Sequence, residues 1–250
     1  MARIFEQGHA NNVSSLERLN LTLTEIGGEY QPSNEEISLV KLQSVLQDAK
    51  VAIQEVTNAI TNYTHAVNNR QILFIDVKGY STQVVNSVIA SGANAKTVED
   101  VKSINQKIQG SSTQRKTTLP TEESNNPAAT TETVRQISTS QQSYEQITER
   151  FSRLVAMVSA EAKYQPREAR LSREGLTAHL QTLAEANTNV MATYIALQNA
   201  RNRRNAIMYA PQTGIYDLTQ KIKSYIKSIY SPKDATYKQV FAIKFKNLGK

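Results

Sequence analysis

Apolar residues recur along residues 42–74 at intervals that alternate between four and three residues. The positions are Leu42, Leu46, Ala49, Ile53, Val56, Ile60, Tyr63, Val67, Arg70 and Phe74. Only Arg70 departs from the apolar pattern. This heptad spacing is typical of a coiled-coil-like seam and is not produced by a strand. It predicts a long helix over residues 34–75, which begins at Ser33 or Asn34 directly after Pro32.

The same spacing returns over residues 176–208. The positions are Leu176, Leu180, Leu183, Asn187, Val190, Tyr194, Leu197, Arg201, Arg204 and Met208. The polar Asn187 is of the kind that fixes helix register at a cost in stability. Pro211 ends the predicted helix.

Shorter apolar patterns predict further helices around each long one. The first passes through Val13, Leu16, Leu19, Leu23 and Ile26 and stops at Gly27-Gly28, and its longer counterpart passes through Ile137, Tyr144, Ile147, Phe151, Leu154 and Val158. Two closing helices follow each long helix, near 81–90 and 97–109 and near 215–229 and 234–248. Residues 240–246 also alternate partly, as a strand would, but the matching segment of the first half has a helical pattern, so we favour a helix.

Matches between the two halves predict an internal duplication. Tyr30-Gln31-Pro32 recurs as Tyr164-Gln165-Pro166, 134 residues later, and apolar and turn residues then match in order. We therefore expect two diverged copies, near 12–110 and 137–250. The predicted fold is an all-α, elongated helical bundle of two diverged copies of a multi-helix repeat, with pseudo-two-fold character.

A polar segment separates the copies. Fifteen of the 23 residues in 111–133 are Ser, Thr, Asn, Gln or Pro, and Leu119 is the only large apolar one. Such a segment cannot bury enough apolar surface to order itself, so we interpret it as a linker or surface loop rather than a recognition or phosphorylation segment. The predicted organisation is a first repeat at 1–110, a linker at 111–136 and a second repeat at 137–250.

The carboxyl-terminal pattern resembles the ending of a known family. It consists of Lys223-Ser224-Tyr225-Ile226-Lys227-Ser228, Ser231-Pro232, Tyr237-Lys238-Gln239-Val240 and Ile243-Lys244-Phe245. Together with the start MARIFEQGHANN and a variable polar middle, it is similar to an uncharacterised bacterial family, and the resemblance covers nearly the whole chain. That family has no assigned activity, cofactor or partner, so the resemblance implies no functional residue.

Composition and motifs argue against enzymatic chemistry. The 250 residues include no cysteine and no tryptophan, and the three histidines, His9, His65 and His179, lie far apart in the sequence. The zinc motif HExxH, the dinucleotide motif GxGxxG and the Walker loop do not occur. We therefore expect no enzymatic activity, no cofactor and no metal site.

No targeting signal is evident in the sequence. The start MARIFEQGHANN lacks the apolar run of a secretory signal. No stretch of 18 apolar residues is present that would span a bilayer. A cytoplasmic location is the default expectation.

Positive charge is concentrated at the carboxyl end. The formal net charge is +7, but residues 201–250 alone carry eleven lysines and arginines against two aspartates, a net charge of +9. This asymmetry hints at an anionic partner. The candidate anion- or partner-binding residues are Arg201, Arg203, Arg204, Lys221, Lys223, Lys227, Lys238, Lys244 and Lys246. Tyr225, Tyr230 and Tyr237 lie among them and are candidates for stacking on bases.

The leading interpretation is a non-enzymatic structural or protein-interaction module that binds another protein or a second copy of the chain. The alternative is a nucleic-acid-associated basic protein that uses residues 201–250, although no recognised nucleic-acid-binding motif is present. A weaker alternative is a membrane-active helical protein, which lacks an apolar hairpin long enough to insert. A solvated basic face without a partner also accounts for the charge. No small-molecule substrate is evident.

Overall fold

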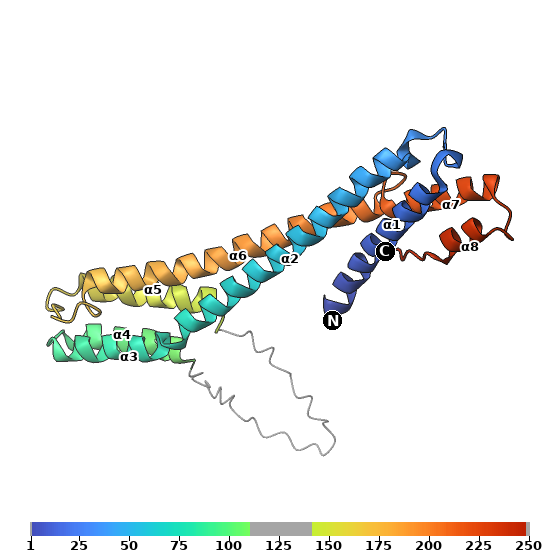
Figure 1. Cartoon of the computed structure of the whole chain (residues 1–250). Helices are drawn as coiled ribbons and strands as arrows, with labels where there is room; N and C mark the ends of the chain where they lie inside the picture. Colours follow the sequence, from blue (N-terminus) through green and yellow to red (C-terminus); the bar gives the residue numbers. More distant parts are fainter. Residues whose placement is uncertain (1, 111–141, 249–250) are drawn as a thin grey trace, which may run out of the picture. The chain divides into compact units, whose positions relative to one another are not determined.

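The structure, a computed structural model, describes residues 2–110 and 142–248, except for the side chains of residues 2–5. Its helices are α1 (Ala2–Ile26), α2 (Leu39–Ile75), α3 (Val77–Ala90), α4 (Ala95–Gln109), α5 (Tyr144–Ala160), α6 (Arg173–Tyr209), α7 (Ile215–Ile229) and α8 (Ala235–Ala242) (Figure 1). Two short 3-10 turns, η1 (Gly27–Glu29) and η2 (Glu35–Ile37), join α1 to α2. No strand occurs in the described residues. The predicted all-α helical bundle is confirmed.

These elements form two compact units. Unit 1 comprises residues 1–65 and 191–250, and unit 2 comprises residues 66–190. The long helices α2 and α6 therefore each supply residues to both units. The predicted repeats at 1–110 and 137–250 divide the chain differently, because each unit draws on both. That division concerns sequence copies, and it stays a prediction.

Unit 1 has its core among α1, α2, α6, α7 and α8. Leu19 and Leu23 of α1 are fully buried in one cluster with Leu42 of α2 and with Ile222 and Ile226 of α7. A second cluster in the unit contains Val13, Leu16, Ala49, Met208 and Ile215. Burying a side chain of this size stabilises a fold by about 1.5–3 kcal/mol relative to leaving it exposed. The apolar stripes of these helices are thus the main source of the unit's stability.

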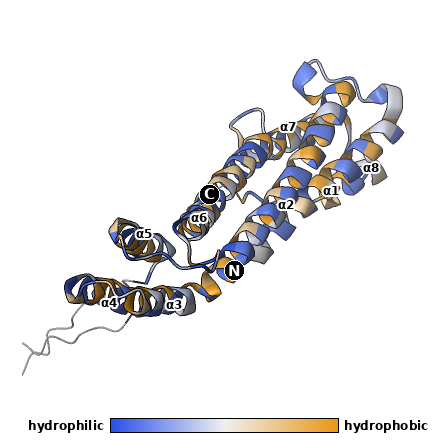
Figure 2. Ribbon diagram, turned by 90° about the vertical axis from the view of Figure 1, so that its left-hand side faces the viewer, coloured by the Kyte–Doolittle hydropathy of each residue, from blue (hydrophilic) through white to orange (hydrophobic). Residues whose placement is uncertain are grey.

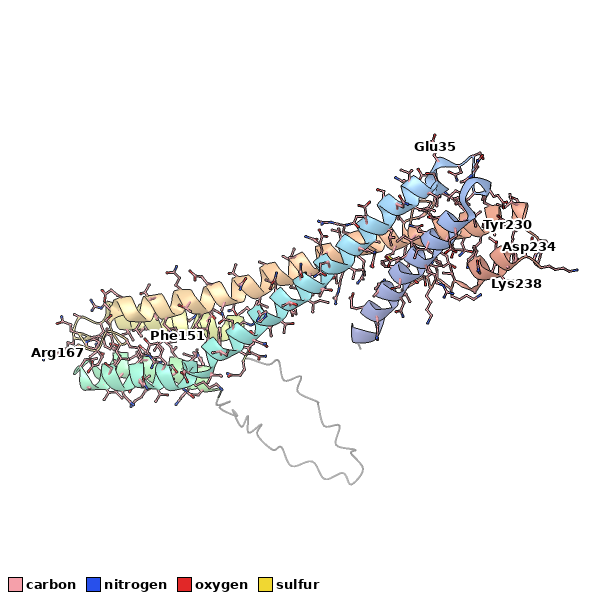
Figure 3. The ribbon with its side chains drawn as sticks, viewed as in Figure 1. Glu35, Phe151, Arg167, Tyr230, Asp234 and Lys238 are labelled. Atoms are coloured by element: carbon pink, nitrogen blue, oxygen red, sulfur yellow. The ribbon has the colours of Figure 1, made fainter. Side chains whose placement is uncertain are left out.

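Unit 2 has its core among α3, α4, α5 and the first half of α6. The ring of Phe151 on α5 lies inside this core, 5.7 Å from the ring of Tyr80 and 5.4 Å from that of His179, measured between centroids (Figure 3). Leu154, Val158, Leu176 and Leu183 are fully buried in the same cluster. Hydrophobic residues are interleaved with hydrophilic ones along α3, α4 and α5, as expected for helices with one buried face (Figure 2).

The predicted seams of both long helices are buried or half-buried at every position but one. The exception is Tyr194, which is 48% exposed. Its ring lies 5.8 Å from that of Tyr63 on α2, so it packs on a neighbouring helix through one side only. The polar seam residue Asn187 donates a 3.0 Å hydrogen bond to the Thr148 hydroxyl of α5. This bond fixes α6 against α5 in unit 2.

The first long helix begins later than predicted. α2 starts at Leu39, because Asn34 caps the turn η2 instead and accepts a hydrogen bond from the Glu36 N–H. Ile37 is 3% exposed in the core, and its carbonyl oxygen accepts a hydrogen bond from the Tyr30 hydroxyl. These bonds hold residues 30–37 outside the helix.

The start of α6 has the same construction, 134 residues further on. Tyr164 donates its hydroxyl to the carbonyl of Leu171 at 2.6 Å, the same length as the bond before α2. The Ser172 hydroxyl accepts from the Gly175 N–H at 3.0 Å, and Ser38 plays the same part at the start of α2. Both helices have 37 residues. The duplication itself stays a prediction.

Three further helices differ from expectation. α1 has 25 residues and α5 has 17, so α1 is the longer of the pair and not the shorter. α5 begins at Tyr144, because the Ser143 side chain accepts from the Gln146 N–H and caps the helix there. The predicted seam residue Ile137 lies outside the described residues, as does the predicted linker at 111–136. α3 begins at Val77, four residues earlier than predicted.

The last closing helix is also shorter than predicted. α8 ends at Ala242, and residues 243–248, here called the C-terminal segment, continue without helix or strand. The Asn12 side chain of α1 donates to the Lys246 carbonyl at 2.8 Å and accepts from the Lys246 N–H at 3.0 Å. The Ser15 hydroxyl donates to the Lys244 carbonyl at 3.0 Å. Side chains of α1 thus satisfy backbone groups of this segment that a continued helix would have paired within itself.

Candidate functional site

Two of the predicted basic residues, the half-buried Arg201 and the buried Arg204, are paired within unit 1 rather than free on its surface. The side chain of Arg204 is 5% exposed and forms an ion pair with one carboxylate oxygen of Glu6 on α1. The Nε atom of Arg201 lies 3.3 Å from the other oxygen. Burial lowers the pKa of Arg204 below its ordinary value, and the Glu6 carboxylate opposes that shift. The two arginines therefore hold α1 against α6, and they are not a free surface for an anion.

Arg203 is exposed but also paired. One of its terminal nitrogens donates to both carboxylate oxygens of Glu55 on α2, at 2.9 and 2.7 Å. The pair lines a groove of about 450 Å³ whose other walls are asparagine, alanine and threonine side chains of α2 and α6. Since the two charges in the groove neutralise each other, it offers an anion no net attraction.

Four of the six predicted lysines differ in whether their ammonium is bonded to a backbone carbonyl. Lys221 donates to the Gln212 carbonyl at 2.8 Å and Lys244 donates to the Phe241 carbonyl at 3.0 Å. Lys238 is exposed on α8, in the part of unit 1 where Figure 3 labels it beside Tyr230 and Asp234. The Lys246 side chain is exposed as well.

The structure gathers Lys223, Lys227 and Lys244 around Phe241 and Phe245. The ammonium of Lys223 lies 5.6 Å from the ring centroid of Phe241 and 6.0 Å from that of Phe245. The ammonium of Lys227 lies 5.3 Å from the ring centroid of Phe241. We call these five residues the basic–aromatic cluster. It joins α7, α8 and the C-terminal segment.

Electrostatics in this cluster are unfavourable for the chain alone. Burial first and the charge of Lys244 second lower the pKa of Lys223 below its ordinary value. The Lys223 ammonium also donates to the Ile243 carbonyl at 2.7 Å. Over residues 2–110 and 142–248, no ion pair joins Lys223, Lys227 or Lys244 to a carboxylate. The described chain therefore leaves the positive charge of the cluster unneutralised.

The tyrosines predicted to stack on bases are occupied within the unit. Tyr237 stacks on Phe241 with centroids 4.2 Å apart and planes inclined by 9°. Tyr225 packs edge-to-face on Tyr30 at 5.3 Å, and the Tyr230 hydroxyl donates to the Glu29 carboxylate. These rings connect elements of unit 1 to each other, so they do not form an open stacking platform.

Sequence reasoning missed a polar network on α1. His9 is 3% exposed, and its Nδ1 atom lies 2.9 Å from the Tyr209 hydroxyl, which also accepts from the Asn12 amide at 3.1 Å. Burial first and the nearby Arg204 charge second lower the pKa of His9. A signal was present, because residues 9 and 12 continue the spacing of the buried positions Leu16 and beyond toward the amino end.

The C-terminal segment packs through side chains as well as through backbone bonds. Ile243 is 3% exposed in the core of unit 1. A Cβ atom on Gly8 would lie 2.6 Å from the Cδ1 atom of Leu248, so the glycine provides the room in which Leu248 sits. The C-terminal segment thus packs on α1 and contributes to the core of unit 1.

Unit 2 has a groove of its own, of about 580 Å³, between α3 and residues 163–171. Tyr164 lies in the chain between two of its lining residues, Lys163 and Gln165. Burial raises the pKa of the Tyr164 hydroxyl, and Ser87 of α3 opposes that shift. The Lys163 ammonium at the rim donates to the Gly92 carbonyl at 3.0 Å. The ammonium of Lys163 therefore satisfies a backbone carbonyl within the unit.

Among the described residues, no three His, Asp or Glu side chains lie close enough to hold a metal ion together. No helix of the described chain has the length and apolar character needed to cross a membrane. Comparisons with family models, with curated proteins and with solved structures find no match, in keeping with a resemblance to a family that has no assigned activity.

Proposed function

We propose that this protein is a non-enzymatic helical interaction module that binds an acidic segment of a partner protein through the basic–aromatic cluster. The observation that carries the proposal is the grouping of three lysines without a carboxylate of the described chain to neutralise them. Lys223 and Lys227 lie over phenylalanine rings, and Lys244 is bonded to the Phe241 carbonyl beside them.

A carboxylate-bearing partner would relieve a cost that the free protein bears. Lys223 and Lys244 repel each other, and the burial of Lys223 strengthens that repulsion by lowering the local dielectric. An aspartate or glutamate side chain placed between them would replace repulsion with attraction. Phe241 and Phe245, both half-buried, offer apolar surface for the methylene groups of such a side chain. Charge complementarity of this kind mainly raises the association rate and the specificity of binding.

Two features favour a protein partner over a nucleic acid. Arginine is the residue that binds phosphate with two parallel hydrogen bonds, and Arg201, Arg203 and Arg204 are engaged by Glu6 and Glu55. Stacking of bases needs open ring faces, whereas Phe241 carries Tyr237 on its ring and the two lysine ammoniums over it. A cluster of lysines that has neither an unpaired arginine nor an open ring face suits the carboxylates of a protein better than the phosphates and bases of a nucleic acid.

The experiment compares poly-L-glutamate, duplex DNA and single-stranded RNA as probes, from low to physiological salt. The variant Lys227→Gln/Lys244→Gln removes two charges of the cluster at exposed positions. Its matched control, Lys41→Gln/Lys102→Gln, removes two exposed charges elsewhere. Fluorescence anisotropy with the labelled probe gives the dissociation constant, and a melting curve of each variant checks its fold.

We expect the wild type to bind poly-L-glutamate at low salt and the cluster variant to bind it at least about five-fold more weakly, with the control within about two-fold of wild type. No binding of poly-L-glutamate at low salt, or equal binding by wild type and cluster variant, would overturn the proposal. Tighter binding of DNA or RNA that the cluster variant loses would replace the protein partner with a nucleic acid.

A further inference from the structure

Each unit is assembled from both halves of the sequence. In unit 1, α1 and the first part of α2 pack with the end of α6 and with α7 and α8. In unit 2, α5 and the first part of α6 pack with the end of α2 and with α3 and α4. We call the first two helices of each half its hairpin: α1 with α2, and α5 with α6. The hairpin of each half therefore packs against the last two helices of the other half, here called its closing helices.

The first helices of the two hairpins bury the same pattern. Leu16, Leu19 and Leu23 of α1 are fully buried, and 135 residues later so are Phe151, Leu154 and Val158 of α5. The spacing and the degree of burial match within each unit. Both hairpins thus present the same arrangement of apolar side chains to their closing helices.

The closing helices match as well. Val77, Val84 and Val88 of α3 are buried, as are Ile215, Ile222 and Ile226 of α7, 138 residues later. A buried hydroxyl accompanies each set: Ser81 donates to the Lys78 carbonyl at 2.9 Å, and Thr219 donates to the Tyr216 carbonyl at 2.7 Å. α3 and α7 therefore bury the same pattern of side chains, each in its own unit.

The contact between hairpin and closing helix is made at corresponding places. Tyr30 packs edge-to-face on Tyr225 of α7 in unit 1. In unit 2 the side chain of Ser87 on α3, 138 positions before Tyr225, lies close enough to the equivalent Tyr164 to influence the pKa of its hydroxyl. The same residue of each hairpin thus meets the same position of each closing helix.

We propose that this chain associates with a second copy of itself by exchanging halves, so that residues 1–110 of one chain fold with residues 137–250 of the other. Every contact within a unit is kept when the two halves come from different chains, so the exchanged dimer loses none of the packing described above. The inference rests on the composition of the units and is independent of the basic–aromatic cluster.

The concentration of the chain during folding decides between the monomer and the exchanged dimer. In one chain the halves are joined covalently, and a covalent connection gives an effective concentration of roughly the millimolar range. The 31 residues 111–141 reach at most about 100 Å when extended, which allows one chain to contribute to two bodies. Exchange therefore competes only when chains fold together at a comparable concentration.

The experiment refolds the full-length chain from denaturant at about 1 µM and at about 1 mM, and then measures mass by size exclusion with light scattering. We expect monomer from the dilute sample and a substantial dimer from the concentrated one, which persists after dilution. A protease site inserted between residues 120 and 130 is then cut in both pools. An exchanged dimer must collapse to a 1:1 complex of the two fragments with the mass of the cut monomer.

A shortened chain provides the control. Deletion of residues 114–138 leaves a connection that still closes within one chain, because the Gln142 amide already lies 3.1 Å from the Lys107 carbonyl. A shorter connection that still closes raises the effective concentration of the two halves within one chain, so we expect the shortened chain to give less dimer than the wild type at about 1 mM. Monomer from the wild type at both concentrations, or a dimer that keeps its double mass after cutting, would overturn the proposal.

Discussion

The hydroxyl of Tyr30 donates a 2.6 Å hydrogen bond to the carbonyl oxygen of Ile37, and both residues are buried. Tyr30→Phe keeps the ring but leaves this buried carbonyl without its partner. We expect the free energy of unfolding to fall by about 1–2 kcal/mol, measured by urea denaturation. Tyr194→Phe, at an exposed ring, is the control and should change it by less than about 0.5 kcal/mol. Equal effects of the two variants would show that the bond does not hold the turn before α2.

Val56 and Val40 lie on the same helix with opposite exposures. Val56 is 1% exposed among Leu197 and Ala200, whereas Val40 is 80% exposed. Val56→Asp places an unpaired carboxylate in an apolar layer, and we expect a loss of more than about 3 kcal/mol, enough to unfold a marginal protein. Val40→Asp should stay within about 0.5 kcal/mol. Thermal melting followed by circular dichroism tests both, and a small shift for Val56→Asp would contradict the packing of this seam.

Glu6 and Glu55 provide a second matched comparison. Glu6→Gln removes the counter-charge of Arg204, whose side chain is 5% exposed, and we expect a loss of about 2 kcal/mol. Glu55→Gln breaks the pair with Arg203, whose side chain is 62% exposed, and should cost less than about 1 kcal/mol. Chemical denaturation gives both values. The reverse order would mean that Arg204 is solvated in the folded protein.

Acidification should destabilise the fold through two histidines. Burial first, then Arg204 for His9 and Arg170 for His179, lower both pKa values below 6.5, while Glu6 and Asp76 oppose the shifts. The unfolded chain thus takes up these protons more readily than the folded one, so stability is full above pH 6.5 and falls as the pH drops below it.

The double variant His9→Gln/His179→Gln isolates this effect. The wild-type melting temperature should drop by several degrees between pH 7.5 and pH 5.5, since one kcal/mol is worth about 2–4 °C at this size. The variant should show a smaller drop over the same interval. Equal slopes for both proteins would assign the pH dependence to other groups.

Local pattern was sufficient to predict most helices but not how they end. The period of apolar residues placed α2, α6 and α7 well, because each buries one stripe along its length. The C-terminal segment was predicted to be helical, and it is not, because Asn12 binds Lys246 from 234 positions away. No local signal contains that contact.

The candidate site shows the same division. Charge alone marked nine basic residues, and the sequence could not show that Glu6 and Glu55 would engage the three arginines. Nor could it show that Lys223, Lys227 and Lys244 meet at Phe241, since that depends on how α8 folds back on α7. A sequence shows which residues are charged. Tertiary packing decides which of these charges are paired with an opposite charge and which are left unpaired.

The two units differ in one respect that matters while the chain is being made. Unit 2 is one continuous stretch, residues 66–190, whereas unit 1 needs residues 1–65 together with residues 191–250. On the ribosome, unit 2 has all its helices available before α7 has been synthesised. Leu19 and Leu23 of α1, by contrast, emerge first and wait for Ile222 and Ile226. The amino-terminal helices are therefore the part of the nascent protein that chaperones have most time to bind.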